Sequence, residues 1–137
     1  MSGAYSRSKG KRGELELVHL LRDYLGVEVN RNYKQFAQSQ HGDIEQLVGG
    51  YLLEVKNCAV LALPTWWSQA VAAAKARNAI PCVVYRVARK RDIADRWRFV
   101  LPLPQAWDTG ADWRYDLRYA ANVGIEGFAL LARERGI

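Results

Sequence analysis

The spacing of apolar residues near the N-terminus predicts an amphipathic helix. Leucine or valine occupies positions 17, 18, 21 and 25, which recur at the intervals of one helical face. Gly26 follows directly and is typical of a helix end. We therefore expect a helix from Glu14 to Leu25.

Two acidic residues at the start of this helix should differ in their surroundings. Glu14 precedes Leu17 by three positions and so falls on the apolar stripe that faces the rest of the protein. An N-cap role for Glu14 is the alternative, because Gly13 could also begin the helix. Glu16 is expected on the side that faces mostly water, in line with His19, Leu20 and Asp23.

Apolar runs further along the chain predict strands. Val27–Asn30 alternates like a strand, and residues 33–42 form a polar stretch that is typical of a loop. Asp43–Val48 and Tyr51–Asn57 are two more strand-like runs, separated by Gly49-Gly50. A pair of glycines between two such runs predicts a β-hairpin.

A second helix and two more strands are expected after the hairpin. Pro64-Thr65 begins an alanine-rich helical segment that reaches Asn78, with Thr65 as a candidate N-cap. Ile80–Val87 is rich in β-branched residues, as buried strands are, and Trp97–Leu103 fits a further strand.

The C-terminal part has a weaker pattern, in which Gly124–Arg135 fits a short helix that Gly136 would end. The order of elements predicts an α/β fold with a central mixed sheet and helices packed on it. The strand, helix and strand between residues 51 and 87 should form a right-handed crossover. No repeat or linker divides the chain, so we expect a single domain.

The predicted hairpin gathers charged side chains on one face. A two-residue turn aligns the flanking strands so that every second residue shares a face. The charged face then holds Asp43, Glu45, Glu54 and Lys56, and the opposite face holds Ile44, Leu53 and Val55. Such a group of acids is costly unless solvent, a cation or salt bridges balance it. A strand pair that simply faces solvent is the alternative without function.

A hard divalent cation would explain the acids. Mg²⁺ is usually held by one or two carboxylates together with water and a substrate phosphate. Asp43 and Glu54 fit that role, and Glu14 could reach them from the helix. A lysine beside the metal, here Lys56, can orient a water molecule or offset the charge of a phosphoryl transition state.

The net positive charge of the chain favours a polyanionic partner. The 137 residues include 20 Lys and Arg against 14 Asp and Glu, for a net charge of +6. Residues 1–12 contain four cations and no acid, and residues 86–98 contain six cations and two acids. Clusters of this kind favour a nucleic acid, with solvated surface charge as the alternative.

The sequence carries no sign of a membrane or secreted protein, so we expect a cytoplasmic location. No apolar run approaches the roughly 20 residues of a membrane span, and the N-terminus is polar and basic. Cys58 and Cys82 have apolar neighbours and fit reduced core thiols. A zinc site that joins them to His19 and His41 is disfavoured, because the short paired spacing of zinc ligands is missing.

These motifs together resemble the PD-(D/E)XK nuclease superfamily, and within it the archaeal-type Holliday junction resolvases. Asp43 matches the first acid, and Glu54-Val55-Lys56 matches the E-x-K element, which occurs once in the chain. Lys9-Gly10 before Glu14 is similar to the start of those resolvases, where a Lys-Gly pair precedes a helical catalytic glutamate. The resemblance covers residues 9–104.

The resemblance also has limits along the chain. Gly42 stands where the superfamily name has proline, and Glu45 adds an acid where an apolar residue is usual. The aromatic residues of the C-terminal part have no counterpart in the family: Trp107, Trp113, Tyr115 and Tyr119. We therefore expect a basic arm at residues 1–12, a restriction-endonuclease-like nuclease core at 13–104 and a C-terminal extension at 105–137.

The resemblance implies a Mg²⁺-dependent DNA endonuclease, with Mn²⁺ as a substitute, that cuts branched four-way junctions as a homodimer. The metal ligands would be Asp43, Glu54, the Val55 carbonyl and Glu14, and Lys56 would position the nucleophile. The expected DNA-binding residues are Arg7, Lys9, Lys11, Arg12, Lys34 and His41. The apolar and aromatic residues that could form the dimer contact are Trp66, Trp67 and those of residues 113–131, with burial in the core of one chain as the more frequent alternative for any one tryptophan.

Two other functions fit the sequence. A restriction-like or phage nicking enzyme of the same superfamily would cut linear or flapped DNA instead of junctions. A non-catalytic DNA-binding module would use the basic arm and the tryptophan-rich region, and the acids would then be structural.

Overall fold

The computed structural model describes residues 3–26, 47–57, 60–87, 90–103 and 115–136. Within these ranges a four-stranded sheet is flanked by helices. The elements in chain order are α1 Gly3–Leu25, β1 Tyr51–Lys56, α2 Leu63–Ala76, β2 Ile80–Arg86, the 3-10 turn η1 Ile93–Arg96, β3 Trp97–Pro102, the 3-10 turn η4 Leu117–Tyr119, β4 Ala120–Val123 and α3 Ile125–Glu134. No helix among them is long and apolar enough to cross a membrane.

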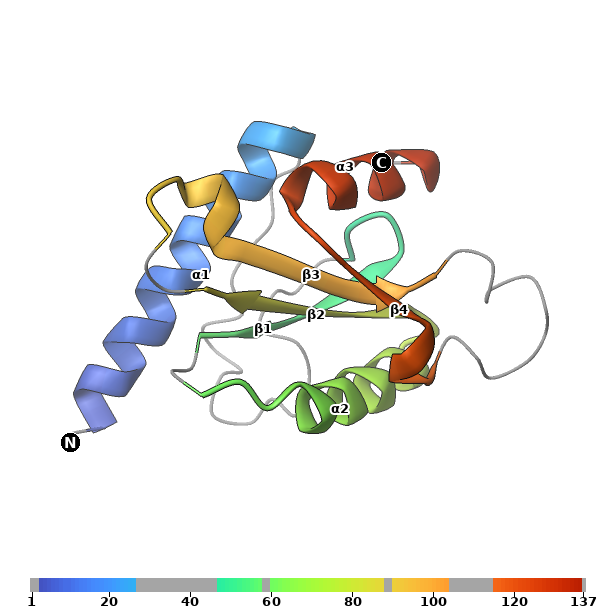
Figure 1. The fold of residues 1–137 in the computed structure, drawn as a ribbon, viewed down its shortest axis with the longest axis horizontal. Coiled ribbons are helices and arrows are strands. Elements are labelled where there is room, and N and C mark those ends of the chain that lie inside the picture. The colour runs from blue at the N-terminus through green and yellow to red at the C-terminus, as the bar shows by residue number, and fades with distance from the viewer. Residues whose placement is uncertain (1–2, 27–46, 58–59, 88–89, 104–114, 137) are drawn as a thin grey trace.

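The sheet is mixed, as the sequence predicts. Its strands lie in the order β1-β2-β3-β4, with β1 and β2 parallel and the other two pairs antiparallel (Figure 1). Helix α2 connects the parallel pair, because parallel neighbours need a crossover between them. The α/β class with helices on a central mixed sheet is therefore confirmed.

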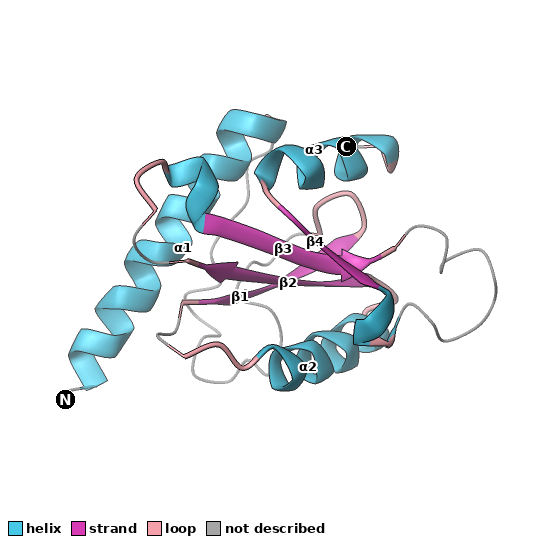
Figure 2. Cartoon of the chain, viewed as in Figure 1, coloured by secondary structure: helices cyan, strands magenta, loops and turns pink. Residues whose placement is uncertain are grey.

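The helices cover both faces of the sheet. Figure 2 shows α1 and α3 on one side and α2 on the other. The larger part of the core lies under α1 and α3, where Phe99 and Phe128 stack with ring centroids 4.5 Å apart. Leu17 and Leu21 of α1 are fully buried in the same cluster, so the predicted apolar stripe of this helix is confirmed.

On the α2 side, a smaller cluster contains Trp66 and Trp67. Their exposed fractions are 7% and 4%, and they pack against Val83 and Val100 of the sheet. The indole of Trp67 also donates a hydrogen bond to the Tyr115 carbonyl at 3.0 Å. Of the two alternatives for these tryptophans, burial in the core of one chain is therefore confirmed, and the dimer contact is wrong for them.

The turn before β1 has the predicted form. Val48 and Tyr51 pair as an antiparallel bridge with two backbone hydrogen bonds of 3.0 and 2.9 Å. Gly49 and Gly50 have φ angles of +59° and +84°, a left-handed conformation that favours glycine at both central positions of a two-residue turn. The hairpin beyond Val48, including Asp43 and Glu45, lies outside the described residues.

Two helix boundaries differ from the predictions. Helix α1 begins at Gly3 and not near Glu14. Residues 3–13 include glycines and serines, which have low helix propensity, and have no apolar stripe, so the sequence gives no sign of this first part. Glu14 is therefore inside the helix, and its N-cap alternative is wrong. Helix α2 begins at Leu63 after Ala62, which places Thr65 inside the first turn instead of at the cap.

The C-terminal part contributes more to the fold than its weak pattern indicates. Strand β4 pairs with β3, although no strand is expected there from sequence. Three of its four residues are partly buried and Asn122 is exposed, and four residues are too short a run for an alternating pattern to be recognised. Helix α3 is confirmed, and Gly136 follows its last turn with a φ of +87°.

Candidate active site

The E-x-K element forms the end of β1. The Lys56 ammonium nitrogen lies 3.4 Å from Oε1 of Glu54. The exposed fractions of the two side chains are 22% for the lysine and 9% for the glutamate. A carboxylate that is nearly buried beside a partly accessible ammonium group is an arrangement that can bind a cation and assist a substrate.

The two charged residues share the face of the sheet that α2 covers. In the parallel register Glu54 is the partner of Val83, and Lys56 is the partner of Tyr85. Both partners pack in the tryptophan cluster under α2. Leu53 and Val55 belong to the opposite core, so the predicted alternation along β1 is confirmed.

Glu14 is buried on α1, as its place on the apolar stripe predicts. Its exposed fraction is 5%, and Glu14 and Glu54 are the two charged residues that are buried within the described ranges. Burial of a carboxylate is costly and calls for polar or charged groups around it. Both glutamates make such interactions, and their burial makes them the two described acids that are the strongest candidates for a functional role.

A close approach between α1 and the end of β1 relates the two glutamates. A methyl group built on Gly13 would lie 2.5 Å from Nδ2 of Asn57, a separation that atoms do not adopt without a shift. Gly13 adjoins Glu14, and Asn57 adjoins Lys56. The absence of a side chain at Gly13 therefore lets α1 bring Glu14 toward the end of the strand that carries the E-x-K element.

The structure contradicts the prediction that Glu16 lies on the water-facing side of α1. Its carboxylate accepts hydrogen bonds from Nε of Arg86 at 3.1 Å and from the indole nitrogen of Trp97 at 2.9 Å. Nη1 of Arg96 lies 3.5 Å from its other oxygen. Glu16 instead anchors α1 to the end of β2 and the start of β3.

The sequence interpretation did not identify the structural partners of Glu16, which are Arg86, Arg96 and Trp97. It also did not identify the close approach of Asn57 to Gly13. The apolar Leu20, in line with Glu16, was the one sign that this side of α1 is covered, and its exposed fraction is 6%. No local pattern connects Glu16 to partners 70 and 81 positions away.

The partners of Glu16 also keep it ionised. Burial acts to raise its pKa, but the hydrogen bonds from Arg86 and Trp97 and the charges of Arg86 and Arg96 outweigh burial. The pKa of Glu16 is therefore lowered from its ordinary value of 4.5.

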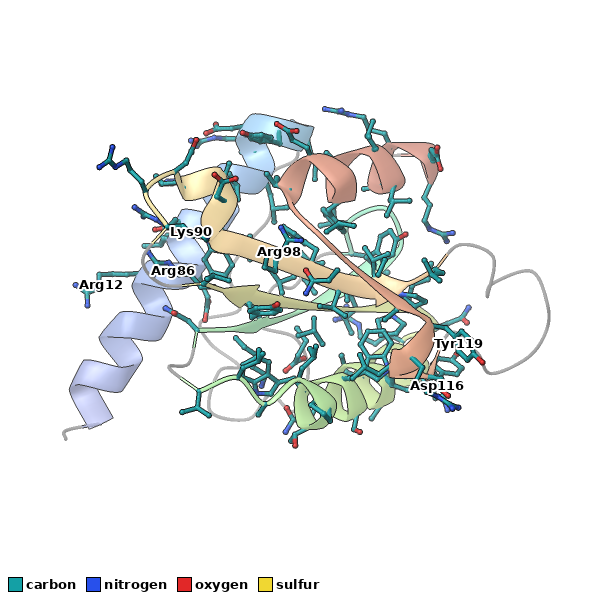
Figure 3. All side chains as sticks on the ribbon, in the orientation of Figure 1. Arg12, Arg86, Lys90, Arg98, Asp116 and Tyr119 are labelled. Atoms are coloured by element: carbon teal, nitrogen blue, oxygen red, sulfur yellow. The ribbon has the colours of Figure 1, made fainter. Side chains whose placement is uncertain are left out.

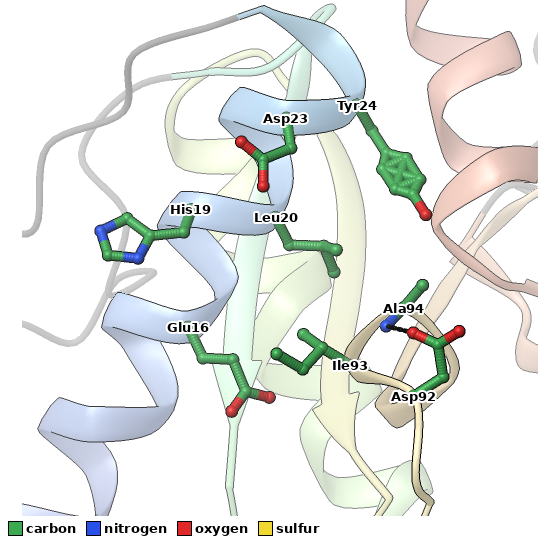
Figure 4. A pocket seen from close by; sticks show the side chains of 8 residues that line it. All are labelled: Glu16, His19, Leu20, Asp23, Tyr24, Asp92, Ile93 and Ala94. Atoms are coloured by element: carbon green, nitrogen blue, oxygen red, sulfur yellow. Dashed lines mark hydrogen bonds between the residues drawn. The ribbon is translucent and has the colours of Figure 1, made fainter.

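An open groove of about 270 Å³ lies between α1 and η1. Figure 4 shows its lining, with Glu16 and Asp23 on α1 and Asp92 at the start of η1. Asp92 is directed at the backbone, because its carboxylate accepts from the Ala94 amide at 3.3 Å. No group of three His, Cys, Asp or Glu residues that could hold a metal is found within the described ranges.

The remaining predicted site residues are only partly covered by the structure. Helix α1 carries Arg7, Lys9 and Lys11, whose side chains are outside the description, while Arg12 is exposed. The other predicted residues lie outside the described residues, so their contribution stays a prediction: Lys34, His41 and Asp43.

One of the two cysteines can be placed. Cys82 is a free thiol, fully buried in the core, and burial raises its pKa above the ordinary value. The expectation of a reduced core thiol is confirmed for Cys82, and Cys58 lies outside the described residues.

Comparison with known proteins identifies the family. A family model described as "Phage putative PDDEXK endonuclease" matches residues 5–113, which is more than half of the chain and includes most of α1 and the E-x-K element. No curated protein and no solved structure gave a significant match. The chain belongs to this PD-(D/E)XK endonuclease family.

Proposed function

We propose that the protein is a metal-dependent endonuclease that cuts branched DNA, with the four-way junction as its substrate. The observation that carries this proposal is the end of β1, where buried Glu54 pairs with Lys56 beside the contact between Gly13 and Asn57. Membership of a PD-(D/E)XK endonuclease family supports the nuclease chemistry.

The donor groups of this region fit a hard divalent cation. Carboxylate and carbonyl oxygens are the ligands that Mg²⁺ and Mn²⁺ accept in proteins. We assign the ligands to Asp43, Glu54 and the Val55 carbonyl, with Glu14 holding the metal or its water. The bound metal would supply Lewis acidity for phosphodiester hydrolysis.

Lys56 would act on the reacting groups. Its ammonium group is partly accessible and forms an ion pair with Glu54, which would hold it beside the assigned metal ligands. From there it can donate to the attacking water or to a phosphate oxygen. Donation to a charge that grows in the transition state lowers the barrier more than it strengthens substrate binding.

The branched substrate and a homodimer belong together in this proposal. Each chain carries one E-x-K element, and a four-way junction is resolved by two symmetric cuts. A two-fold dimer is the commonest closed assembly and matches the symmetry of the junction. The net charge of +6 suits a DNA partner.

A gel assay tests the proposal. A labelled four-way junction and a linear duplex of the same arm sequence are incubated with the wild-type chain and with Glu54→Gln, in Mg²⁺ and in EDTA. We expect paired cuts of the junction by the wild type in Mg²⁺ alone. Asp43→Asn should match Glu54→Gln, because both remove an anion from the metal site.

The other outcomes separate the alternatives. Equal cutting of linear duplex, or single nicks by a chain that light scattering identifies as a monomer, would favour the restriction-like or nicking enzyme. Binding of DNA without cleavage in Mg²⁺ or Mn²⁺ would favour the non-catalytic module. Full activity of Glu54→Gln would overturn the assigned metal site.

A further inference from the structure

Most cations with described side chains are engaged within the protein. Arg86 and Arg96 contact Glu16, Arg98 donates to Asn122, and Arg118 pairs with Asp116. The side chains of Arg12, Lys90 and Arg91 differ, because they make no ion pair, hydrogen bond or ring contact with other described residues, and all three residues are exposed. Within the described ranges, no acidic side chain pairs with these three charges, which makes them candidates for contact with a partner.

The loop that carries Lys90 and Arg91 is braced by Arg96. Nε of Arg96 donates to the Lys90 carbonyl at 2.8 Å, and Nη2 donates to the Arg91 carbonyl at 3.2 Å. The third guanidinium nitrogen faces Glu16. One arginine thus fixes the backbone of two exposed cations and ties it to α1, which lowers the entropy cost of ordering the loop on a ligand.

Arg12 lies on the same side of the molecule as this loop. It precedes Glu16 by four positions, so the two share a face of α1. Glu16 is in turn joined through Arg96 to the loop. Figure 3 shows Arg12, Arg86 and Lys90 together on this side.

The proposed active site lies at the same edge of the sheet. Strands β1 and β2 are parallel, so Lys56 at the end of β1 and Arg86 at the end of β2 reach one edge. The loop follows β2, and Arg12 precedes the glycine that contacts Asn57. The exposed cations Arg12, Lys90 and Arg91 therefore lie toward the end of the sheet that carries the E-x-K element.

We propose that Arg12, Lys90 and Arg91 form a surface that binds the sugar–phosphate backbone of DNA beside the cleavage site. This inference rests on the proposed function and names a DNA-binding surface that adds Lys90 and Arg91 to the predicted basic residues of α1. Exposed cations on a braced backbone suit phosphates, which carry charge in every sequence. The surface would hold the DNA in register for cutting without selecting a base sequence.

The test measures binding without cleavage. Fluorescence anisotropy of a labelled duplex in EDTA gives the affinity over a range of salt concentrations. Each phosphate contact contributes about 0.9 to the slope of log affinity against log salt. We expect Lys90→Gln/Arg91→Gln to reduce that slope by up to about two units, and Arg12→Gln by about one.

Two controls separate a positioned surface from bulk charge. Lys75→Gln/Arg77→Gln removes two charges near the start of β2, at the opposite end of that strand, and should leave the slope within about 0.3. Arg96→Lys keeps the net charge but loses the two carbonyl contacts that hold the loop. It should weaken binding several-fold while far-UV circular dichroism and the thermal midpoint report that the chain is folded.

The outcomes are distinct from those of the cleavage assay. Equal slopes for Lys90→Gln/Arg91→Gln and for the control pair would overturn the surface, whether or not the protein cuts junctions. A slope change on single-stranded RNA but not on duplex DNA would also overturn it. If the wild-type chain binds no DNA in EDTA or with Ca²⁺, both the surface and the proposed function fail.

Discussion

Glu14 and Glu16 lie two positions apart on α1 and occupy contrasting surroundings. Glu16 is surrounded by three donors from β2, η1 and β3, and these partners lower its pKa. Glu14 is more deeply buried, with an exposed fraction of 5%, and lies next to the close contact between α1 and the end of β1.

The difference separates an anchor from a candidate catalytic group. A carboxylate whose oxygens already accept from Arg86 and Trp97 has little capacity left for a metal or a substrate. A buried carboxylate next to the glycine that closely approaches Asn57, one residue beyond the E-x-K element, is a candidate for a functional role. On one helix, therefore, Glu16 fixes the rotation of α1, and that rotation turns Glu14 inward.

The largest effect that tests this contrast is on catalysis. Glu14→Gln should lower kcat on a junction by about 10²-fold, because it removes a charge that we place next to the metal or its water. Glu16→Gln should lower kcat per folded molecule by less than tenfold. Single-turnover cleavage at saturating protein measures both, and the opposite ranking would reverse the roles of the two acids.

The direction in which each side of α1 faces is a feature that the sequence alone predicts in part. The apolar positions 17 and 21 give the buried side of the helix and so predict that Glu14 faces inward. The same alternation rule predicts the faces of β1, and the paired glycines predict its turn. Each of these signals is local, because the residues that carry it are neighbours in the chain.

Partners far apart in sequence left no such signal. Glu16 was expected to face water because a polar side chain on a helix usually does, yet Arg86 and Trp97 approach it from strands that pair only in the folded sheet. The contact between Gly13 and Asn57 likewise depends on how α1 crosses the end of β1. Strand β4 was missed because its short run is recognisable only by its pairing with β3.

A second effect should appear in stability. Glu16→Gln replaces a charged acceptor with a neutral amide and leaves Arg86 and Arg96 without their counter-charge, so we expect a loss of about 2 kcal/mol in the free energy of unfolding. Urea unfolding followed by tryptophan fluorescence at pH 7 measures it. Glu134→Gln, at the exposed end of α3, is the matched control and should change stability by less than about 0.5 kcal/mol.

A substitution at Gly13 tests whether the close approach of α1 to the end of β1 is needed for the position of Glu14. Gly13→Ala gains about 1 kcal/mol of helix propensity, which offsets the strain of moving Asn57, so stability should change little. Cleavage should fall about tenfold, because a small displacement of Glu14 from the E-x-K element disturbs the geometry of the site. Gly13→Ala/Asn57→Ala should recover most of the activity, and no recovery would mean that the contact does not govern the site.

The smallest effect is the pH dependence of the anchor. The folded-state pKa of Glu16 is lowered from 4.5, so its contribution to stability is fully present above that pH and is lost as the pH falls through the folded-state value. The stability gap between the wild type and Glu16→Gln should therefore be constant from pH 7 to about pH 5 and shrink below pH 4.5. Urea unfolding at pH 7, 5, 4 and 3.5 gives the gap directly. A gap that stays constant down to pH 3.5 would mean that hydrogen-bond geometry, and not the charge of Glu16, holds α1 on the sheet.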